Sequence, residues 1–350
     1  MSKIRVGFIG VGTMGQCAHL QNYATLPDCE VVALAEIQPK LAAKVARRYD
    51  VPKVYEDHRT MLATEQLDAV VCIQPFTRHG QLLPEVFDAG RFVITEKPLA
   101  SSLPIGRVLH EKAEASPATY FVAYHKRSDP ATIRAKAEIE SWKQSGQFGA
   151  MRYIRVTMPP GDWIAGGFNA LIRSDDPAPD LAHDPKPDDM DDDTYRQYTA
   201  FVNYYIHQVN LIRHLLGEDY RVSYADPSRV LLVGHSDSGV TVNLEMAPYH
   251  NSIDWQEQAM VCFEKGYIKL DLPAPVAHHR AGAVTIMKDA GGEGQPVTMQ
   301  PTMPWVHAMR QQAIHFIAAA RGEATPLCTT ADALKDLEIA HEYIRQLRGG

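Results

Sequence analysis

Two short stretches of the sequence contain side chains that could move or stabilise protons. In "FVNYYIHQVN", residues 201–210, His207 lies between Asn203 and Asn210. An imidazole with an unperturbed pKa of about 6.5 exchanges its proton at neutral pH and is the most common general base in enzymes. In "TEKP", Lys97 follows Glu96, and an ammonium group there could donate to a hydroxyl or carbonyl oxygen. The simpler explanations are that His207 is a structural histidine and that Glu96 and Lys97 form a surface ion pair. The secondary-structure elements that carry these residues indicate which explanation applies.

The segment from Tyr195 to Gly217 has the spacing of a single helix that ends at Gly217. Residues at i, i+4, i+7 and i+11 share one helix face. The spacing predicts a polar stripe, bordered by aromatic residues that include Tyr204, at positions Asn203, His207, Asn210 and His214. A carboxylate neighbour would raise the pKa of His207, whereas a neutral amide would not. The sequence therefore favours a histidine that accepts a proton readily at neutral pH.

The N-terminal stretch reads as a strand, a tight turn and a helix. "KIRVGFIG" is rich in β-branched residues and runs directly into "GVGTMG", where Gly10, Gly12 and Gly15 match G-x-G-x-x-G, with Thr13 and Met14 inside the motif. In such a turn the first glycine permits the sharp bend, the second lets the backbone approach a pyrophosphate, and the third allows close packing of the helix. The motif predicts a dinucleotide-binding turn.

The next apolar run, "EVVALAE", ends in Glu36, where a Rossmann unit places the acidic residue that binds a ribose 2′-hydroxyl. A carboxylate at this position repels the additional phosphate of NADP, and Lys40 is the one nearby cation in the following "IQPK". We therefore expect NAD rather than NADP as the cofactor.

Strand and helix patterns continue to alternate as far as "TYFVAYH", which predicts a parallel, doubly wound sheet with its ligands at the carboxyl ends of the strands. The residues at those ends are the candidates for binding the cofactor. They are Gly10, Gly12, Thr13, Met14, Gly15, Glu36, Gln74, Pro75, His79, Glu96 and Lys97.

Length and composition limit the classes of protein. A chain of 350 residues exceeds the roughly 250–300 residues that one hydrophobic core usually serves, so we expect two domains. A net charge of −7 without a Lys/Arg block argues against a nucleic-acid surface. No apolar run approaches the roughly 20 residues that span a bilayer, and the five scattered cysteines suit reduced thiols better than disulfides or a metal site. We expect a cytoplasmic protein that acts on a small molecule, with no metal and no membrane partner.

The chain after Tyr124 has a different pattern. Consecutive alternating strands, including "MRYIRVTMP", "SRVLLVGHSDSGVTVNLEMAP" and "WQEQAMVCFEKGYIKLDLP", predict an antiparallel sheet with one free face. Residues 174–194 are rich in Asp and Pro and lack periodicity, which is typical of a solvated loop or of a lid. A closing helix is predicted over residues 329–348.

Together these motifs resemble the Gfo/Idh/MocA oxidoreductases. The likeness includes the glycine motif, Glu36, "EKP" at residues 96–98 and the later histidine helix, and it extends to "SGQFGAMRYIRV" and "TTADALKDLEIAHEYIRQL". The resemblance implies an α/β Rossmann domain over residues 1–124, followed by an α+β domain with an open, mostly antiparallel sheet over residues 125–350. It also implies hydride transfer between NAD and a hydroxyl or ketone of a sugar, sugar derivative or cyclitol.

The resemblance also implies roles for individual residues. Lys97 would contact the reacting oxygen next to a cis Lys97-Pro98 bond, His207 would be the general base, and His79 would lie near the nicotinamide ribose. The family usually has aspartates where this chain has Asn203 and Asn210. The residues expected to bind substrate are Asn203, Tyr124, Lys126, Arg127, Asp162, Trp163, Tyr204 and Asn210. A homodimer or homotetramer formed through the free face of the second sheet is expected.

Two other functions are compatible with the same residues. An NAD-dependent glycosidase would oxidise a sugar transiently at C3, eliminate the aglycone and return the hydride. A sugar- and NAD-sensing regulator would bind the same ligands without turnover, but Lys97 and His207 argue against it.

Overall fold

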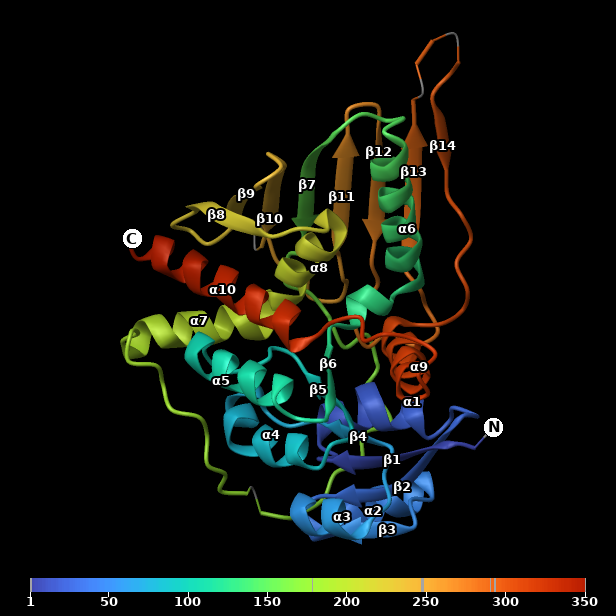
Figure 1. Cartoon of the computed structure of the whole chain (residues 1–350), viewed down its shortest axis with the longest axis vertical. Coiled ribbons are helices and arrows are strands. Elements are labelled where there is room, and N and C mark those ends of the chain that lie inside the picture. The colour runs from blue at the N-terminus through green and yellow to red at the C-terminus, as the bar shows by residue number, and fades with distance from the viewer. Residues whose placement is uncertain (1, 178, 247–248, 290, 293, 350) are drawn as a thin grey trace. The chain divides into compact units, whose positions relative to one another are not determined.

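Figure 1 shows the computed structural model, which describes residues 2–177, 179–246, 249–289, 291–292 and 294–349. Contacts divide the chain into two compact units. The first contains Met1–Tyr124, Gly167–Thr199 and Gln312–Leu337, and the second contains His125–Gly166, Ala200–Gln311 and Glu338–Gly350. Two segments that lie far beyond residue 124 therefore pack with the N-terminal part of the chain.

The first unit contains the parallel sheet that the sequence predicts. Its six strands pair only in parallel, in the order β3-β2-β1-β4-β5-β6. The strands are β1 (Ile4–Ile9), β2 (Cys29–Ala35), β3 (Lys53–Tyr55), β4 (Ala69–Cys72), β5 (Phe92–Glu96) and β6 (Thr119–Ala123). The strand order reverses between β1 and β4, and a doubly wound sheet binds its ligand at this switch point.

The helices of this unit follow the strands. They are the π-helix η1 (Gly15–Leu20), α1 (Gln21–Tyr23), α2 (Pro39–Tyr49), α3 (His58–Thr64), the 3-10 helix η2 (Phe76–Arg78), α4 (His79–Asp88) and α5 (Leu103–Glu114). Two longer helices, α9 (Ala308–Ala320) and α10 (Thr330–Leu347), each have residues in both units.

A chain of aromatic rings explains why the late segment packs with the first unit. The Phe8 ring lies 5.5 Å from the Tyr23 ring, which lies 6.0 Å from the ring of Phe316 in α9, and Phe316 lies 5.9 Å from Phe121. All four side chains are buried in one core cluster. Phe316 and Phe8 thus belong to the same hydrophobic core although they are far apart in the sequence, and no local sequence pattern predicts this contact.

The second unit contains an eight-stranded sheet in the order β14-β13-β12-β11-β7-β10-β9-β8, antiparallel except between β10 and β7. The strands are β7 (Met151–Thr157), β8 (Tyr220–Ala225), β9 (Leu231–Ser236), β10 (Thr241–Glu245), β11 (Gln258–Phe263), β12 (Gly266–Asp271), β13 (Ala283–Lys288) and β14 (Val297–Met299). The predicted fold class is confirmed for both sheets.

Helices cover one face of this second sheet. The helix α6 (Pro130–Ser145) packs on β12 and β13, and α8 (Ile206–Leu216) packs on β7 and β10, on the same side of the sheet in Figure 1. On that side Phe263 of β11 is buried, 5.1 Å from the Trp142 ring of α6. On the opposite side Met260 and Cys262 are only partly buried. Assembly through this opposite face remains a prediction.

The single helix predicted from Tyr195 to Gly217 is wrong in two respects. The first helix, α7 (Asp192–Tyr204), begins within the stretch predicted to be loop, and the helix is interrupted at Tyr205 before α8 begins. The Tyr205 hydroxyl donates to the carbonyl oxygen of Met246 at 2.8 Å, which anchors the interruption to the end of β10. The predicted end is correct: Gly217 has φ +78° and its N–H donates to the Arg213 carbonyl.

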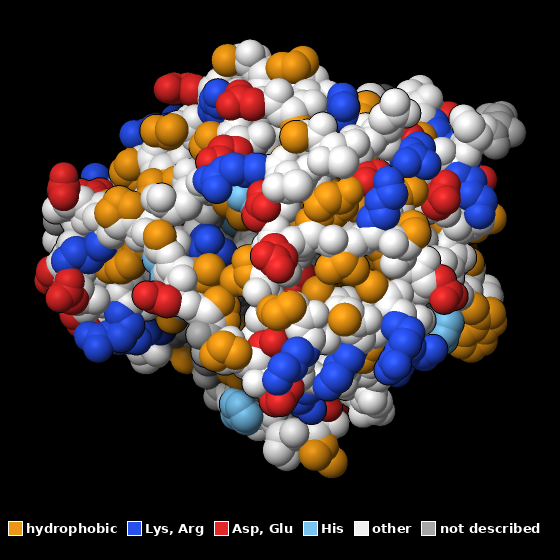
Figure 2. Space-filling model, turned by 90° about the horizontal axis from the view of Figure 1, so that it is seen from below, with side chains coloured by type: hydrophobic (Ala, Val, Ile, Leu, Met, Phe, Trp, Pro, Cys, Tyr) orange, Lys and Arg blue, Asp and Glu red, His pale blue; other side chains and the backbone are white. Residues whose placement is uncertain are grey.

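The surface carries charges of both signs. Figure 2 shows Lys and Arg side chains interspersed with Asp and Glu across the face seen from below. In the described part of the chain, no helix combines the length and the apolar character needed to cross a membrane.

Candidate functional site

The three glycines of the first turn have distinct surroundings. At Gly10, with φ +87°, a Cβ atom would lie 2.3 Å from the Ile73 carbonyl oxygen, and at Gly15 it would lie 2.5 Å from the Gly10 carbonyl oxygen. A Cβ atom at Gly12 would meet no atom within 4 Å. Gly10 and Gly15 are therefore required by packing, whereas Gly12 borders open space that a pyrophosphate can approach. This is the arrangement that a bound dinucleotide needs.

The helix that follows the turn is irregular. Thr13 and Met14 begin it, exposed and half-buried respectively, and residues Gly15–Leu20 then form a π-helix. A π-helical turn accommodates one more residue than an α-helical turn, and such turns occur often at functional sites. Here the π-helix contains His19, whose role is described below.

The Glu36 carboxylate at the end of β2 is fixed by backbone donors. One oxygen accepts from the Val11 N–H at 2.9 Å, within the glycine turn, and the other accepts from the Gln38 N–H at 3.0 Å. The side chain is nearly buried. A carboxylate held here retains lone pairs for the hydroxyls of a ribose. Gly12 therefore leaves space for the pyrophosphate of NAD, and Glu36 offers acceptors for the hydroxyls of its ribose.

The residues after β4 differ in accessibility. Gln74 is half-buried and accepts from Arg78 Nη1 at 3.0 Å, and Pro75 is exposed. His79 is completely buried; burial lowers the pKa of its imidazole, and its Nδ1–H donates to the Leu99 carbonyl at 3.0 Å. The His79 ring is thus part of the interior beneath the loop that follows β5.

Glu96 is the last residue of β5, and Lys97 and Pro98 follow it at the carboxyl edge of the parallel sheet. The Lys97-Pro98 peptide bond is cis, as the resemblance implies. Lys97 is half-buried, and its N–H donates to the Glu96 carboxylate at 3.3 Å. Glu96 also pairs with His19, whose Nε2 lies 2.7 Å from Glu96 Oε1. Burial opposes ionisation of Glu96, but the hydrogen bond and charge of His19, with the charge of Lys97, lower the pKa of its carboxyl.

We expect replacement of His19 by leucine to destabilise the protein more at pH 7 than at pH 4. In the wild type the lowered pKa of Glu96 stabilises the fold above the ordinary carboxyl pKa of about 4.3, and this contribution is lost as pH falls through the folded pKa. Without His19, burial raises that pKa, so ionisation of Glu96 instead destabilises the fold as pH rises. Urea unfolding followed by circular dichroism at both pH values measures the difference.

The matched control for this prediction is Glu96→Gln in the His19→Leu background. A neutral amide cannot ionise, so the additional instability at pH 7 should disappear in the double variant. An equal loss of stability at both pH values in His19→Leu would contradict the electrostatic explanation.

The second unit contains a buried ion pair that the sequence analysis did not predict. Lys126, in the 3-10 helix η3 (His125–Ser128), pairs with Glu257 just before β11, and their side chains are 5% and 0% exposed. Gln208 of α8 donates to the other Glu257 oxygen at 2.7 Å, and the Lys126 ammonium lies 5.8 Å from the Trp255 ring. The charge of Lys126 is therefore neutralised within the protein.

The predicted polar stripe is not uniform in the structure. Asn203 is exposed, His207 is half-buried and Asn210 is buried, where it accepts from Arg127 Nε at 2.8 Å. The His207 ring makes an edge contact with the ring of His125, with centroids 4.5 Å apart. The interruption at Tyr205 separates Asn203, on α7, from the other three predicted positions, which all lie on α8.

A cavity of about 570 Å³ lies at the end of the second sheet where β7 and β12 finish and β11 and β13 begin. Its lining includes Asp162, Trp255, Glu257 and Arg280. The Trp255 Nε1 atom is buried and makes no hydrogen bond to any described residue, so the indole contributes its ring rather than an accessible N–H to the lining. Asp162 uses one oxygen to accept from the backbone N–H groups of residues 164 and 165. Acidic, aromatic and cationic groups in one cavity suit a polyhydroxylated molecule.

The structure places the other predicted residues as follows. Tyr124 is buried at the end of β6 in the first unit, and in the second unit Tyr204 is half-buried, its ring 5.0 Å from that of Tyr205. Trp163 is half-buried beside Asp162. His19, Glu257 and Trp255 were missed. The sequence could have indicated His19 only through its position four residues after Gly15. No pattern in the sequence indicates Glu257, because its partner Lys126 lies 131 positions away.

A nucleotide-binding turn with an acidic ribose anchor, a parallel sheet and a second antiparallel sheet define the class of two-domain, dinucleotide-dependent oxidoreductases. Residues 4–124 match the sequence profile of the Gfo/Idh/MocA family, described as an oxidoreductase family with an NAD-binding Rossmann fold. Residues 4–124 therefore match this family, and the cofactor of its Rossmann fold is NAD.

Individual relatives match over most of the chain. The scyllo-inositol 2-dehydrogenase (NAD(+)) of Bacillus subtilis is 24% identical, with 99% of this chain and 95% of the relative aligned. An oxidoreductase from Desulfitobacterium hafniense, described as NADPH-dependent, has a TM-score of 0.78 at 13% identity over 99% of this chain and 96% of its own. A levoglucosan dehydrogenase in complex with NADH and levoglucosan has a TM-score of 0.73 at 18% identity, covering 99% and 98%. At these identities the structural neighbours support the fold alone.

Proposed function

We propose that the protein is an NAD-dependent dehydrogenase that acts on a secondary hydroxyl of a sugar, sugar derivative or cyclitol. The observation that carries the proposal is that Lys97 follows β5 at the same carboxyl edge of the sheet as the glycine turn and Glu36. The names of relatives that act on inositols and on levoglucosan support this class of substrate.

The proposed chemistry separates a hydride from a proton. Bound NAD would supply the hydride acceptor for the carbon that bears the hydroxyl. Lys97 donates a hydrogen bond to the oxygen and stabilises the negative charge that develops on it. His207 accepts the hydroxyl proton, so that the alcohol becomes a ketone and the lost proton resides on the imidazole. A neutral imidazole with amide rather than carboxylate neighbours in sequence is suited to this role.

In the second unit, the cavity lined by Asp162, Trp255 and Arg280 is the proposed binding region for the polyol. Its polar groups can exchange hydrogen bonds with ring hydroxyls, and the indole face can pack on the apolar face of a sugar ring. Because the Lys126 ammonium pairs with Glu257, the proposed substrate is a neutral polyol, and a contact of Lys126 with substrate remains a proposal. Asn203 is exposed, and it is proposed to contact a hydroxyl of the substrate.

The test is incubation with NAD and a panel that includes myo-inositol, scyllo-inositol, levoglucosan and glucose, followed by NADH absorbance. We expect NADH formation in proportion to turnover with at least one polyol. A chromogenic glycoside included in the panel tests the alternative activity. Release of its aglycone without NADH accumulation, and no NADH with any polyol, would contradict the proposed function and favour redox-neutral glycoside cleavage.

A further inference from the structure

The Asp/Pro-rich segment that the sequence left without a role contacts the proposed adenosine side of the first unit. We call residues 172–177 the acidic strap. Its first residue exchanges two hydrogen bonds with Gln16 in η1: Ile172 N–H donates to Gln16 Oε1 at 3.0 Å, and Gln16 Nε2 donates to the Ile172 carbonyl at 3.2 Å. Its last residue, Pro177, accepts from Gln38 Nε2 at 3.3 Å. The acidic strap thus connects the helix after the glycine turn with the start of α2.

Two carboxylates of the acidic strap meet the first turn of α2. Asp176 accepts from the Leu41 N–H at 2.9 Å and from the Lys40 N–H at 3.3 Å, and Asp175 pairs with Lys40 Nζ at 2.9 Å. The Lys40 hydrogen bond lowers the pKa of Asp175; hydrogen bonds from Ser174, Leu41 and Lys40 lower the pKa of Asp176 against an opposing desolvation. Both groups are therefore anionic at neutral pH.

These contacts occupy the groups that would otherwise bind a phosphate. The N–H groups at a helix N-terminus and a nearby lysine are the usual partners of a phosphate. The helix α2 begins at Pro39, three residues after Glu36, which is expected to bind the ribose 2′-oxygen. In this chain the Lys40 and Leu41 N–H groups donate to Asp176, and the Lys40 ammonium pairs with Asp175. A 2′-phosphate would meet three carboxylates at this turn. Of the nearby cations, Lys40 pairs with Asp175 and Lys44 donates to the Arg173 carbonyl at 3.1 Å, so the exposed Arg173 side chain is the one positive group of the acidic strap itself.

We propose that Asp175 and Asp176 are specificity-determining residues that, with Glu36, exclude NADP. The acidic strap comes from a distant part of the sequence, so selectivity is not set by the end of β2 alone. The inference concerns cofactor binding and holds whichever hydroxyl compound the protein oxidises.

The test is direct binding of NADH and NADPH, followed by nicotinamide fluorescence without substrate, to the wild type and to Asp175→Asn/Asp176→Asn. Asparagine keeps the shape and an acceptor oxygen, so α2 retains its contact. We expect the Kd for NADPH to fall about tenfold while the Kd for NADH stays within about twofold. The control is Asp188→Asn, which removes an exposed charge farther along the same segment and should change neither Kd.

A second measurement does not depend on any variant. In the wild type, the Kd for NADPH divided by the Kd for NADH should fall toward one as the salt concentration rises from about 0.05 M to about 0.5 M. Salt screens the repulsion between the carboxylates and the additional phosphate of NADPH. The proposal is overturned if this ratio is independent of salt. It is also overturned if the double variant leaves NADPH binding unchanged while Glu36→Gln alone removes the preference for NADH.

Discussion

Replacement of Lys97 by alanine is expected to lower kcat by about 10³-fold while the Kd for NADH changes by less than about threefold. Lys97 follows β5 beside a cis proline and a buried Glu96–His19 pair, so its backbone is fixed by groups that the substitution leaves in place. The ammonium group is proposed to interact with an oxygen whose negative charge grows during hydride transfer. Loss of such an interaction lowers kcat more than it raises KM.

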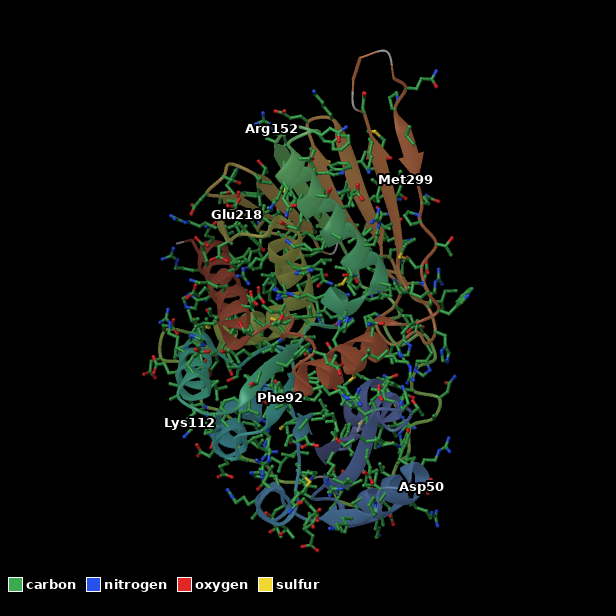
Figure 3. All side chains as sticks on the ribbon, turned by 45° about the vertical axis from the view of Figure 1, so that its right-hand side comes forward. Asp50, Phe92, Lys112, Arg152, Glu218 and Met299 are labelled. Atoms are coloured by element: carbon green, nitrogen blue, oxygen red, sulfur yellow. The ribbon has the colours of Figure 1, made fainter. Side chains whose placement is uncertain are left out.

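Two further variants make the Lys97 prediction specific. Lys112→Ala removes a partly exposed lysine on α5 that pairs with Asp88 at 2.7 Å, and it should leave kcat unchanged; Figure 3 labels this residue. Lys97→Arg retains the charge but not the compact geometry of an ammonium, so it should recover little activity. Steady-state kinetics with saturating NAD measures all three. A kcat within tenfold of the wild type for Lys97→Ala would exclude Lys97 from the chemical step.

The parts of the structure that could be predicted are those with local physical causes. Gly10, Gly15 and Glu36 belong to one strand–helix–strand unit formed by β1, the helix after the turn and β2, so their spacing predicts the site. The structure explains each residue by a clash or by a backbone hydrogen bond. The alternation of buried residues along β11 likewise follows from the two-residue period of a strand. Both sheets were predictable for this reason.

The parts that could not be predicted depend on partners distant in sequence. The 312–337 segment joins the first unit through Phe316, and the acidic strap reaches α2 across more than a hundred positions. The ion pair of Lys126 with Glu257 joins positions 131 apart, so no local pattern could predict it, and the contact of Lys126 with substrate stays a prediction. The helix interruption at Tyr205 depends on a bond to Met246, which the helical spacing of residues 195–217 could not reveal.

Replacement of Glu257 by alanine is expected to destabilise the second unit by about 3–5 kcal/mol, because it leaves the buried Lys126 ammonium without its counter-ion. Both side chains are almost completely buried, so water cannot replace the lost carboxylate. Gln208 would lose its acceptor at the same time. All four tryptophans, Trp142, Trp163, Trp255 and Trp305, belong to the second unit, so their fluorescence during urea unfolding reports on this unit.

A double variant separates the charge from the packing. Lys126→Met combined with Glu257→Leu replaces the buried pair with apolar side chains and should recover most of the stability lost in Glu257→Ala, since an apolar replacement of a buried pair is often neutral. The control is Glu264→Ala, which breaks the surface pair with Arg152, labelled in Figure 3, and should cost no more than about 1 kcal/mol. If Glu257→Ala costs no more than this control, the pair is not a determinant of stability. If the double variant is as unstable as Glu257→Ala, the loss comes from packing around Gln208 and Trp255 rather than from an unpaired charge.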